Sequence, residues 1–285
     1  MPSLDDDQLN AYLARIGASR PAAPTLAALN AILGAQLSHI PFENVDVLLH
    51  RTIDIELDAV FDKLVTRRRG GYCFELNTLF AAALETLGFK VTPLAARVRW
   101  NISEGVPTPQ SHMLLRVDVE HRGYLADAGF GGPNPPCAMP LSEPGEALRS
   151  YRLVPPPPNA FGADGFHPLD LEARGAGDWI TLYRFDLTPQ PWVDFVPRNW
   201  FVCTHPDSFF RHTLAVARSE NGARYTLANG RLTLREPDGS ATHHTLETPR
   251  EIVAALRERF ALVLDPDTEA GLAGWLEQAM QDPAR

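Results

Sequence analysis

The chain has 285 residues, of which 45% are hydrophobic and 21% charged, and its formal net charge at pH 7 is −9. That length favours about two domains with a sizeable buried core. The negative charge argues against sequence-independent binding to nucleic acid or anionic lipid, because both need clustered positive charge. No apolar run approaches the roughly 18 residues of a membrane span, and the acidic segment 1–7 is unlike a secretory signal. We therefore expect a soluble, cytoplasmic protein without nucleic-acid or membrane partners.

The chain contains three cysteines, Cys73, Cys137 and Cys203, which lie far apart and form no CxxC pair. This number excludes a dense disulfide scaffold, and it rules out a four-cysteine zinc site within one chain. We expect no bound metal. At least one of the thiols is therefore expected to have a role other than a disulfide or a zinc ligand.

The first ninety residues have the apolar spacing of α-helices. Leu9, Tyr12, Leu13 and Ile16, for example, recur at the i, i+3, i+4 and i+7 positions of one helix face. Capping residues, glycine and proline mark where the helices begin and end. We expect four helices: one from Ser3 as its cap to Gly17, one from Thr25 to Pro41, a short one capped by Asp58 that ends at the basic tract 67–69, and one from Cys73 to Leu87.

From residue 90 the apolar spacing changes to the alternation of β-strands. Residues 112–119 alternate, and the turn-forming residues 120–123 lead into a second strand, so we expect a β-hairpin. The order of helices, strands and then mixed elements predicts an α+β fold. The further expected elements are the returning strand over 124–127, strands near 179–182 and 225–227, and a final helix that begins with the capping box 248–251 and carries Ile252, Leu256 and Phe260.

Cys73 is the thiol best placed for chemistry. It begins the fourth expected helix, where the helix dipole and free N–H groups favour a thiolate. Gly70 and Gly71 directly before it allow a sharp turn and leave room for a substrate. The alternative is a buried structural cysteine, the commonest role of a free cysteine. These residues alone leave the two interpretations nearly balanced.

A nucleophilic cysteine needs a base, and the base needs a group that orients it. His112 begins the strong strand, and Asp127 lies on the returning strand and on the same face. A symmetric turn places Arg116 opposite Asp127, which leaves about 13 Å along the strands between Asp127 and His112. A shifted register or a β-bulge has to close that gap. Other histidines fall in turns, polar stretches or helix ends and are expected to be solvated or structural: His39, His50, His121, His243 and His244.

The common signatures of nucleotide-binding and hydrolytic sites are absent. The chain has no GxxxxGK[ST], GxSxG or HExxH motif, and residues 129–132 lack the third glycine of a dinucleotide fingerprint. Glu43 is better explained as a structural partner of Arg69 than as a general acid. We expect the tract 67–69 to be a solvated helix end rather than an anion site.

Four segments, taken together, form a specific pattern: RGGYC at 69–73, PFEN at 41–44, DAGFG at 127–131 and NWFVCTHPDSFF at 199–210. They resemble the arylamine N-acetyltransferases, in particular the bacterial members, over most of the chain. Cys203 stands where those proteins usually have serine. This near-isosteric change lies outside the expected nucleophile, base and orienting residue.

The resemblance implies a three-part fold, with a helical bundle in residues 1–90, a β-barrel in 91–198 and an α/β lid in 199–285. It also implies a cysteine-protease-like core in which Cys73, His112 and Asp127 form a catalytic triad. Glu43 and Arg69 become a structural ion pair near the site. The implied substrate contacts are Phe42 and Tyr72 in the aryl pocket, Phe130 and Gly131 at the acetyl-CoA cleft, and Thr108 and Phe210 beside them.

The implied reaction is acetyl transfer from acetyl-CoA, a co-substrate rather than a bound cofactor, to arylamines, N-hydroxyarylamines or hydrazines, as in xenobiotic metabolism. It follows a ping-pong mechanism through an acetyl-cysteine. Two alternatives stay open: a transglutaminase-like or amide-hydrolysing enzyme with the same triad, and a non-catalytic binding protein. A papain-type enzyme is excluded, because its histidine follows the cysteine by about 130–150 residues. The sequence leaves open the physiological acceptor, the preferred acyl-CoA, the choice between N- and O-acetylation, and the oligomeric state.

Overall fold

The N-terminal part of the chain folds into helices, and capping chemistry sets where they begin. The computed structural model describes residues 3–175, 177–220, 222–237 and 240–281. The Thr25 side chain accepts a hydrogen bond from the Ala28 amide, as the cap of the second helix should. The helices are α1 (Asp6–Ile16), α2 (Leu26–His39), α3 (Val45–Leu48), α4 (Leu57–Phe61), which continues into a π-helical turn (Asp62–Thr66), and α5 (Cys73–Thr86).

Two of the predicted caps were wrong. Asp5, not Ser3, caps α1, because Asp5 and Gln8 each accept a hydrogen bond from the other's backbone amide. This reciprocal capping box satisfies two free amides and places the helix start after Asp5. In α4 the cap position is held by Glu56, and Asp58 lies in the first turn, where its negative charge suits the helix dipole.

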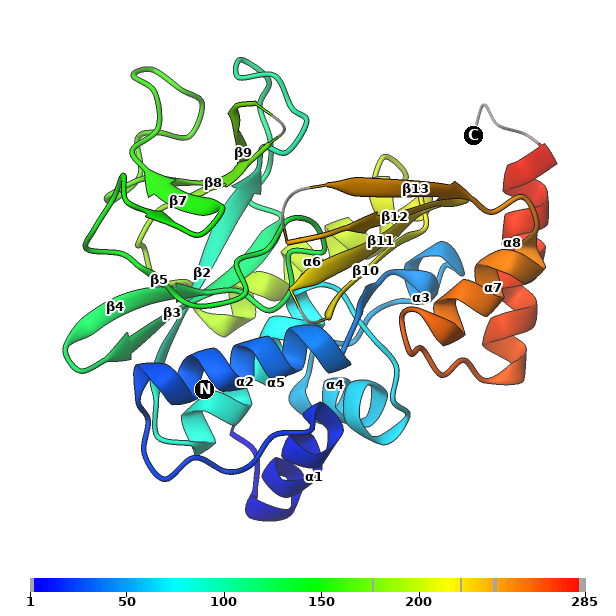
Figure 1. Cartoon of the computed structure of the whole chain (residues 1–285), viewed down its shortest axis with the longest axis horizontal. Coiled ribbons are helices and arrows are strands. Elements are labelled where there is room, and N and C mark those ends of the chain that lie inside the picture. Colours follow the sequence, from blue (N-terminus) through cyan, green and yellow to red (C-terminus); the bar gives the residue numbers. More distant parts are fainter. Residues whose placement is uncertain (1–2, 176, 221, 238–239, 282–285) are drawn as a thin grey trace.

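Helix α5 is buried along nearly its whole length. Every residue from Cys73 to Leu84 is buried, so α5 is the central helix of the bundle rather than an amphipathic surface helix. It packs against α1, α2 and α4 and, on another side, against the strands that follow it. A nucleophile at its first residue therefore sits inside the protein, at the junction of helices and sheet (Figure 1).

The middle of the chain forms an eight-stranded antiparallel sheet that curls into a nearly closed barrel (Figure 1). Its order is β5-β4-β3-β2-β9-β8-β7-β6, so the neighbours β2 and β9 are joined by a long excursion of the chain. The predicted strands at 112–119 and 179–182 are confirmed. The strands are β2 (Lys90–Val98), β3 (His112–Val119), β4 (Arg122–Ala126), β5 (Met139–Pro140), β6 (Ala147–Leu148), β7 (Tyr151–Val154), β8 (Leu169–Arg174) and β9 (Trp179–Phe185).

The register of the β3–β4 hairpin differs from the predicted one. Val119 pairs with Arg122, so the turn contains only Glu120 and His121, which both have positive φ (49° and 66°). Arg116 consequently lies opposite Leu125 rather than opposite Asp127. The predicted symmetric turn was wrong by two residues, and the observed turn moves Asp127 two residues closer to His112.

The C-terminal part adds a second sheet and two helices, and it incorporates a strand from the N-terminal part. Strand β1 (Phe42–Glu43) pairs with β10, so the chain segment before α3 is built into this sheet. The sheet has the order β1-β10-β11-β12-β13. The other elements are a 3₁₀ turn (Trp192–Asp194), α6 (Phe195–Thr204), a 3₁₀ turn (Phe209–Arg211), β10 (Ala215–Glu220), β11 (Ala223–Ala228), β12 (Arg231–Arg235), β13 (Ala241–Thr245), α7 (Pro249–Glu258) and α8 (Pro266–Gln281).

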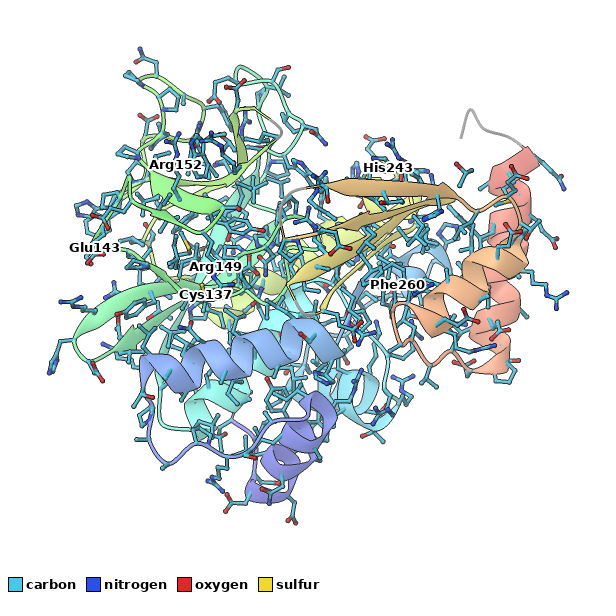
Figure 2. All side chains as sticks on the ribbon, viewed as in Figure 1. Cys137, Glu143, Arg149, Arg152, His243 and Phe260 are labelled. Carbon is cyan, nitrogen blue, oxygen red and sulfur yellow. The ribbon has the colours of Figure 1, made fainter. Side chains whose placement is uncertain are left out.

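Helix α7 begins where its sequence predicts. The Thr248 side chain accepts from the Glu251 amide and proline is the first helical residue, whereas the Glu251 carboxylate accepts from the Glu247 amide rather than completing the box with Thr248. Ile252, Leu256 and Phe260 are fully buried in a cluster with residues of α3, α8 and the five-stranded sheet (Figure 2).

The α+β architecture predicted from the sequence is confirmed, and the division into three parts at residues 90 and 198 stays a prediction. Strand β1 pairs with the C-terminal sheet, and the 198/199 boundary falls within α6. Within the described ranges, no helix is both long enough and apolar enough to cross a membrane.

Candidate active site

Cys73 occupies the N-terminus of α5, and its surroundings explain the sequence before it. The Glu75 carboxylate accepts a hydrogen bond from the Tyr72 amide at 3.0 Å and so closes the first turn. A side chain at Gly71 would place its Cβ 2.7 Å from that carboxylate, so only glycine fits there. Cys73 is 5% exposed, and its Sγ lies 3.9 Å from the Ser111 carbonyl oxygen, its hydrogen-bond acceptor.

The two-residue shift in register brings His112 and Asp127 together. His112 is the first residue of β3, and Asp127 directly follows β4. Their side chains are joined by a hydrogen bond of 2.7 Å between Nε2 and Oδ2, and both residues are 3% exposed. A second side-chain hydrogen bond links His112 to Cys73. The structure thus brings Cys73, His112 and Asp127 together in the order nucleophile, base and orienting carboxylate.

The electrostatics of this pair favour a charged imidazole. Burial lowers the pKa of His112, but the charge of Asp127 and the hydrogen bonds to Asp127 and Cys73 raise it more, to about 10. Burial raises the pKa of Asp127, and its contacts with His112, Asn77 and the Gly129 amide outweigh burial and lower it overall. At neutral pH the pair is therefore imidazolium and carboxylate, and the positive ring stabilises negative charge on the adjacent sulfur.

Aromatic side chains pack beside residues of the triad. The Phe42 and Tyr72 rings lie 5.8 Å and 6.2 Å from the ring of Phe210, centroid to centroid. On the other side, the Phe130 ring meets the His112 ring edge-on at 5.2 Å. Four of the residues expected from the sequence to contact substrate thus form two aromatic walls, one that includes Tyr72, the residue before Cys73, and one against His112.

Gly131 and Thr108 each help to fix the course of the loop in which they lie. Gly131 has φ +76°, and a Cβ there would lie 2.6 Å from the Phe42 ring, so this position needs glycine. Thr108 belongs to the loop that leads into β3. Its carbonyl oxygen accepts from Arg97 at 2.5 Å and its hydroxyl from Arg99 at 3.4 Å, which ties the loop to β2.

A buried cluster of five charged side chains supports the start of α5. The Arg69 guanidinium contacts Glu43 at 2.7 Å and Asp46 at 3.2 Å, and the Lys63 ammonium contacts Asp46 at 2.8 Å and Glu75 at 2.7 Å. Burial lowers the pKa of Arg69, whereas the charges of Glu43 and Asp46 raise it above its ordinary value. Since Glu75 also holds the Tyr72 amide, the cluster fixes the turn that presents Cys73.

This cluster corrects the interpretation of the basic tract. Arg67 and Arg68 are exposed, as a solvated helix end predicts, but Arg69 is only 3% exposed. The backbone turns inward at Arg69 because its charge is paired with buried carboxylates. Over the described ranges, no three His, Cys, Asp or Glu side chains are arranged to hold a metal ion.

Comparisons with known proteins agree with this geometry. The family model described as N-acetyltransferase matches residues 25–269. The arylamine N-acetyltransferase of Mycolicibacterium smegmatis is 37% identical over 260 residues, which cover 90% of this chain and 92% of that protein. The chain belongs to the arylamine N-acetyltransferase family.

Other members of the arylamine N-acetyltransferase family match this chain over a similar share of their length. The arylamine N-acetyltransferase / N-hydroxyarylamine O-acetyltransferase of Salmonella typhimurium is 35% identical over 275 residues, covering 93% of this chain and 94% of that protein. Its solved structure superimposes with a TM-score of 0.86 over 96% of this chain and 100% of that one, at 34% identity. The Mycobacterium marinum enzyme in complex with CoA also has a TM-score of 0.86, at 34% identity and with 95% and 98% coverage.

In this family member, sequence reasoning missed the residue that holds Asp127 against the nucleophile helix. The side-chain amide of Asn77 donates to Asp127 at 3.0 Å and to the Met113 carbonyl at 2.7 Å, and its oxygen accepts from the Ala128 amide at 3.0 Å. The Gly129 amide donates to the same carboxylate oxygen at 2.9 Å. Asn77 lies one helical turn after Cys73 on α5, and a buried amide at that spacing is the signal that could have identified it.

Two further residues that contact Asp127 or His112 could not be identified from the sequence. The Asn134 side chain donates to the Asp127 carbonyl at 2.5 Å, from a proline-rich segment. The fully buried Tyr183, on β9, places its ring 5.0 Å from the His112 ring and 5.1 Å from that of Phe130. Tyr183 comes from a strand distant in sequence, and Asn134, seven residues after Asp127, reaches it from a loop without a periodic pattern, so only the folded chain shows these contacts.

We expect Asn77→Ala to destabilise the protein by about 1–3 kcal/mol, because it leaves the Ala128 amide and one oxygen of Asp127 buried with fewer partners. Urea unfolding followed by far-ultraviolet circular dichroism measures this as a lower midpoint. Transfer activity should fall as well, since Asp127 then loses one of the groups that fix its orientation. A midpoint and an activity both equal to those of the wild type would show that Asn77 does not hold Asp127.

The pair of His112 and Asp127 should make stability depend on pH in a defined way. Because the folded-state pKa of His112 is raised from 6.5 to about 10, its stabilising contribution is complete below about pH 6.5 and is lost as the pH rises towards 10. Because the pKa of Asp127 is lowered from 3.8, its contribution is complete above that pH and is lost as the pH falls further. Thermal unfolding of wild type and His112→Gln between pH 4 and pH 10 measures this. The wild type should lose its advantage from about pH 6.5 upwards, and an advantage that grows in that range would contradict the assigned shift.

Proposed function

We propose that this protein transfers an acetyl group from acetyl-CoA to arylamines, through an acetyl-cysteine formed on Cys73, with His112 as the base and Asp127 as its orienting carboxylate. The observation that carries the proposal is the 2.7 Å contact of His112 with Asp127 beside a cysteine at a helix start. The relatives' names and the complex of one of them with CoA support the choice of substrates.

The first half-reaction is exchange between two thioesters. The Cys73 thiolate adds to the carbonyl carbon of acetyl-CoA, and the tetrahedral intermediate collapses as the bond to the CoA sulfur breaks. Protonated His112 gives its proton to the departing CoA thiolate. The first-turn amides of Cys73 and Phe74 have no intrahelical acceptor, and they are the groups we expect to stabilise the oxyanion. A thioester replaces a thioester, so this step is nearly neutral in free energy.

The second half-reaction uses His112 as a base. An arylamine is neutral at pH 7 and adds to the carbonyl of the acetyl-Cys73 thioester. His112, now neutral, takes the proton from the amine nitrogen, and Cys73 leaves as a thiolate beside the regenerated imidazolium. Asp127 stabilises that positive ring and sets its orientation. N-hydroxyarylamines and hydrazines also fit the step, because each offers a neutral nucleophile with a removable proton.

The aromatic walls suit an aryl acceptor. We assign Phe42, Tyr72 and Phe210 to the face that receives the aryl ring, since the rings of Phe42 and Tyr72 both pack about 6 Å from that of Phe210. Phe130 and Gly131 are assigned to the acetyl-CoA side, and Thr108 to the loop beside it. We place the reaction in the cytoplasm.

The transglutaminase-like and amide-hydrolysing alternative is not favoured. The family match extends over residues 25–269, and the relatives are named as acetyltransferases. The pair of imidazolium and carboxylate described above is sufficient for the thioester reaction.

Steady-state kinetics with acetyl-CoA and an arylamine test the proposal. Double-reciprocal plots at several fixed concentrations of the second substrate should give parallel lines, because CoA leaves before the amine reacts. A glutamine-containing peptide with a primary amine serves as the control for the alternative and should give no product. Intersecting lines, or faster turnover of the peptide, would contradict the proposal.

A further inference from the structure

A cavity of about 620 Å³ lies between α2 and the edge of the eight-stranded sheet, away from the candidate active site. Its walls come from α2, β4, the segment 136–140 and the chain around Leu148, and no member of the triad lines it. The volume is within the range of small-molecule sites in proteins, about 300–1,000 Å³. Figure 2 places Cys137 and Arg149 close together at this position, at the side of the barrel that faces α2.

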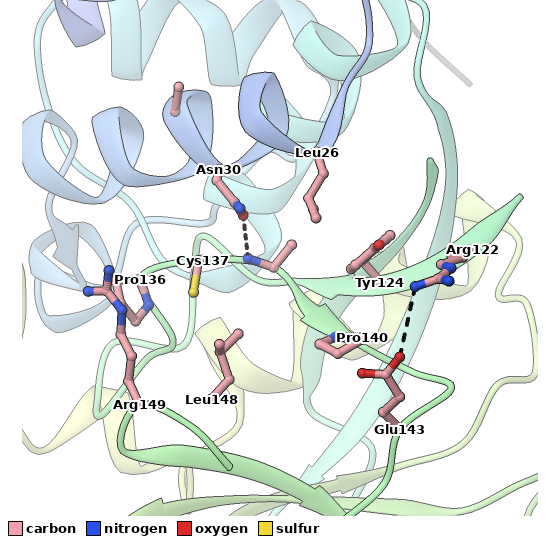
Figure 3. Close-up of a pocket in the computed structure, with 12 residues that line it drawn as sticks. Leu26, Asn30, Arg122, Tyr124, Pro136, Cys137, Pro140, Glu143, Leu148 and Arg149 are labelled. Carbon is pink, nitrogen blue, oxygen red and sulfur yellow. Dashed lines mark hydrogen bonds and ion pairs between the residues drawn. The ribbon is translucent and has the colours of Figure 1, made fainter. Parts of the chain in front are cut away.

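The cavity has an apolar middle and positively charged ends. Leu26 reaches in from α2, and Leu148 and Pro140 lie across the cavity from it (Figure 3). Arg122 lies at one end, where Glu143 partly compensates its charge at 3.9 Å. Arg149 lies at the opposite end.

The charge of Arg149 is available to a ligand. Within the described part of the chain, no carboxylate lies at ion-pair distance from Arg149. Burial raises the pKa of the Cys137 thiol, and the charge of Arg149 opposes that rise. The guanidinium is therefore close enough to the cavity wall to influence this thiol. In a chain of net charge −9, this end of the cavity is a local positive site.

Two polar groups on the walls also lack partners for their hydrogen atoms. Tyr124 is only 8% exposed, yet its hydroxyl has no hydrogen-bond partner among the residues that the structure describes. Asn30 accepts a hydrogen bond from the Ala138 amide at 2.8 Å, and this fixes its oxygen and leaves its NH₂ group for another acceptor (Figure 3). Both residues line the cavity, so these groups are available to polar atoms of a ligand.

We propose that this cavity is a binding site for a small aromatic acid, with its carboxylate at Arg149 and its ring between Leu26 and Leu148. Arginine forms strong, charge-assisted hydrogen bonds to carboxylates, and the leucines and prolines provide the apolar contact that a ring requires. Tyr124 and Asn30 are placed to bind polar substituents of the ring. The site is independent of acetyl transfer, because it uses none of the residues that we assign to that reaction.

The probe is 2-naphthoate, which carries no amine and so cannot act as an acceptor. The full-length Cys73→Ala variant removes the other reactive thiol, and Cys137 reports on the cavity through its labelling by N-ethylmaleimide near pH 8.5, about the ordinary pKa of a thiol. Added 2-naphthoate, up to about 5 mM so that a millimolar Kd is detected, should slow labelling of the Cys137 peptide at least about fivefold. Neutral 2-naphthalenemethanol should need an at least about tenfold higher concentration for the same protection, because it lacks the charge that Arg149 binds.

Matched arginine variants complete the test. Arg149→Gln should raise the Kd of 2-naphthoate, measured by calorimetry, at least about tenfold, equivalent to about 1.4 kcal/mol. Arg250→Gln, which removes an exposed arginine of α7, should leave the Kd unchanged. Both substitutions are at exposed positions, and circular dichroism checks that the variants are folded. Unchanged labelling of Cys137, binding without protection of Cys137, or equal affinity in Arg149→Gln would each overturn the proposal.

Discussion

Cys73→Ala is expected to lower kcat/KM for arylamine acetylation by about 10⁴-fold or more, because no other group can carry the acetyl group between the two substrates. Cys73→Ser should be nearly as inactive, since a serine hydroxyl beside His112 is scarcely ionised at neutral pH. Both variants should keep their fold, because Glu75 holds the start of α5 without help from the hydrogen bonds of Cys73 with Ser111 and His112.

Cys203→Ser is the matched control. Cys203 is buried in α6, and its thiol contacts the Trp200 carbonyl at 3.7 Å, a contact that a hydroxyl can also make. Its activity should stay within about twofold of the wild type, since a change of that size is below 0.5 kcal/mol. Substantial activity in Cys73→Ala would end the triad hypothesis, whatever the other thiols do.

Asp127→Asn is expected to lower kcat/KM by about 10³-fold while the fold is preserved. The amide cannot stabilise an imidazolium, and its NH₂ group favours the wrong tautomer of His112. The pKa of His112 should fall well below about 10, because burial then acts on the ring without the opposing charge of Asp127. A titration of the labelled imidazole by NMR measures this shift directly.

Alkylation of Cys73 by iodoacetamide gives a second, independent readout of Asp127→Asn. A less basic His112 stabilises less negative charge on the sulfur, so alkylation at neutral pH should be slower than in the wild type. Asp118→Asn, at a half-buried position further along β3, is the matched control and should leave the alkylation rate unchanged. Should Asp127→Asn keep the wild-type turnover and alkylation rate, Asp127 is not the orienting residue.

Local signals in the sequence predicted the elements that begin with a cap or alternate regularly. Thr25 and Thr248 mark true helix starts, and the β3–β4 hairpin is where its alternation places it. The register of the β3–β4 hairpin could not be predicted, because Glu120 and His121 adopt positive φ, a conformation usually taken by glycine or asparagine. Gly123, the glycine that drew the predicted turn outward, pairs within the ladder instead.

Contacts between distant segments explain the rest of what was missed. The pairing of Phe42 with Ala217 in the C-terminal sheet has no local pattern, and neither does the contact of the Tyr183 ring with the His112 ring. Lys63 reads as a surface lysine of a short helix, yet it is buried because Asp46 and Glu75 both pair with it. The predicted nucleophile Cys73 and carboxylate Asp127 lie in motifs that resemble those of the family, and the predicted base His112 begins a regularly alternating strand. Their contacts Asn77, Asn134 and Tyr183 lie outside those motifs.

The most direct test is the mass of the protein after brief mixing with acetyl-CoA and no acceptor. Our account predicts a gain of one acetyl group, located by peptide mapping on Cys73, and its loss when an arylamine is added, with one equivalent of acetylated amine formed. Cys73→Ala should gain no mass under the same conditions. An unmodified wild-type protein that still acetylates the amine when both substrates are present, or an acetyl group on another residue, would contradict the mechanism.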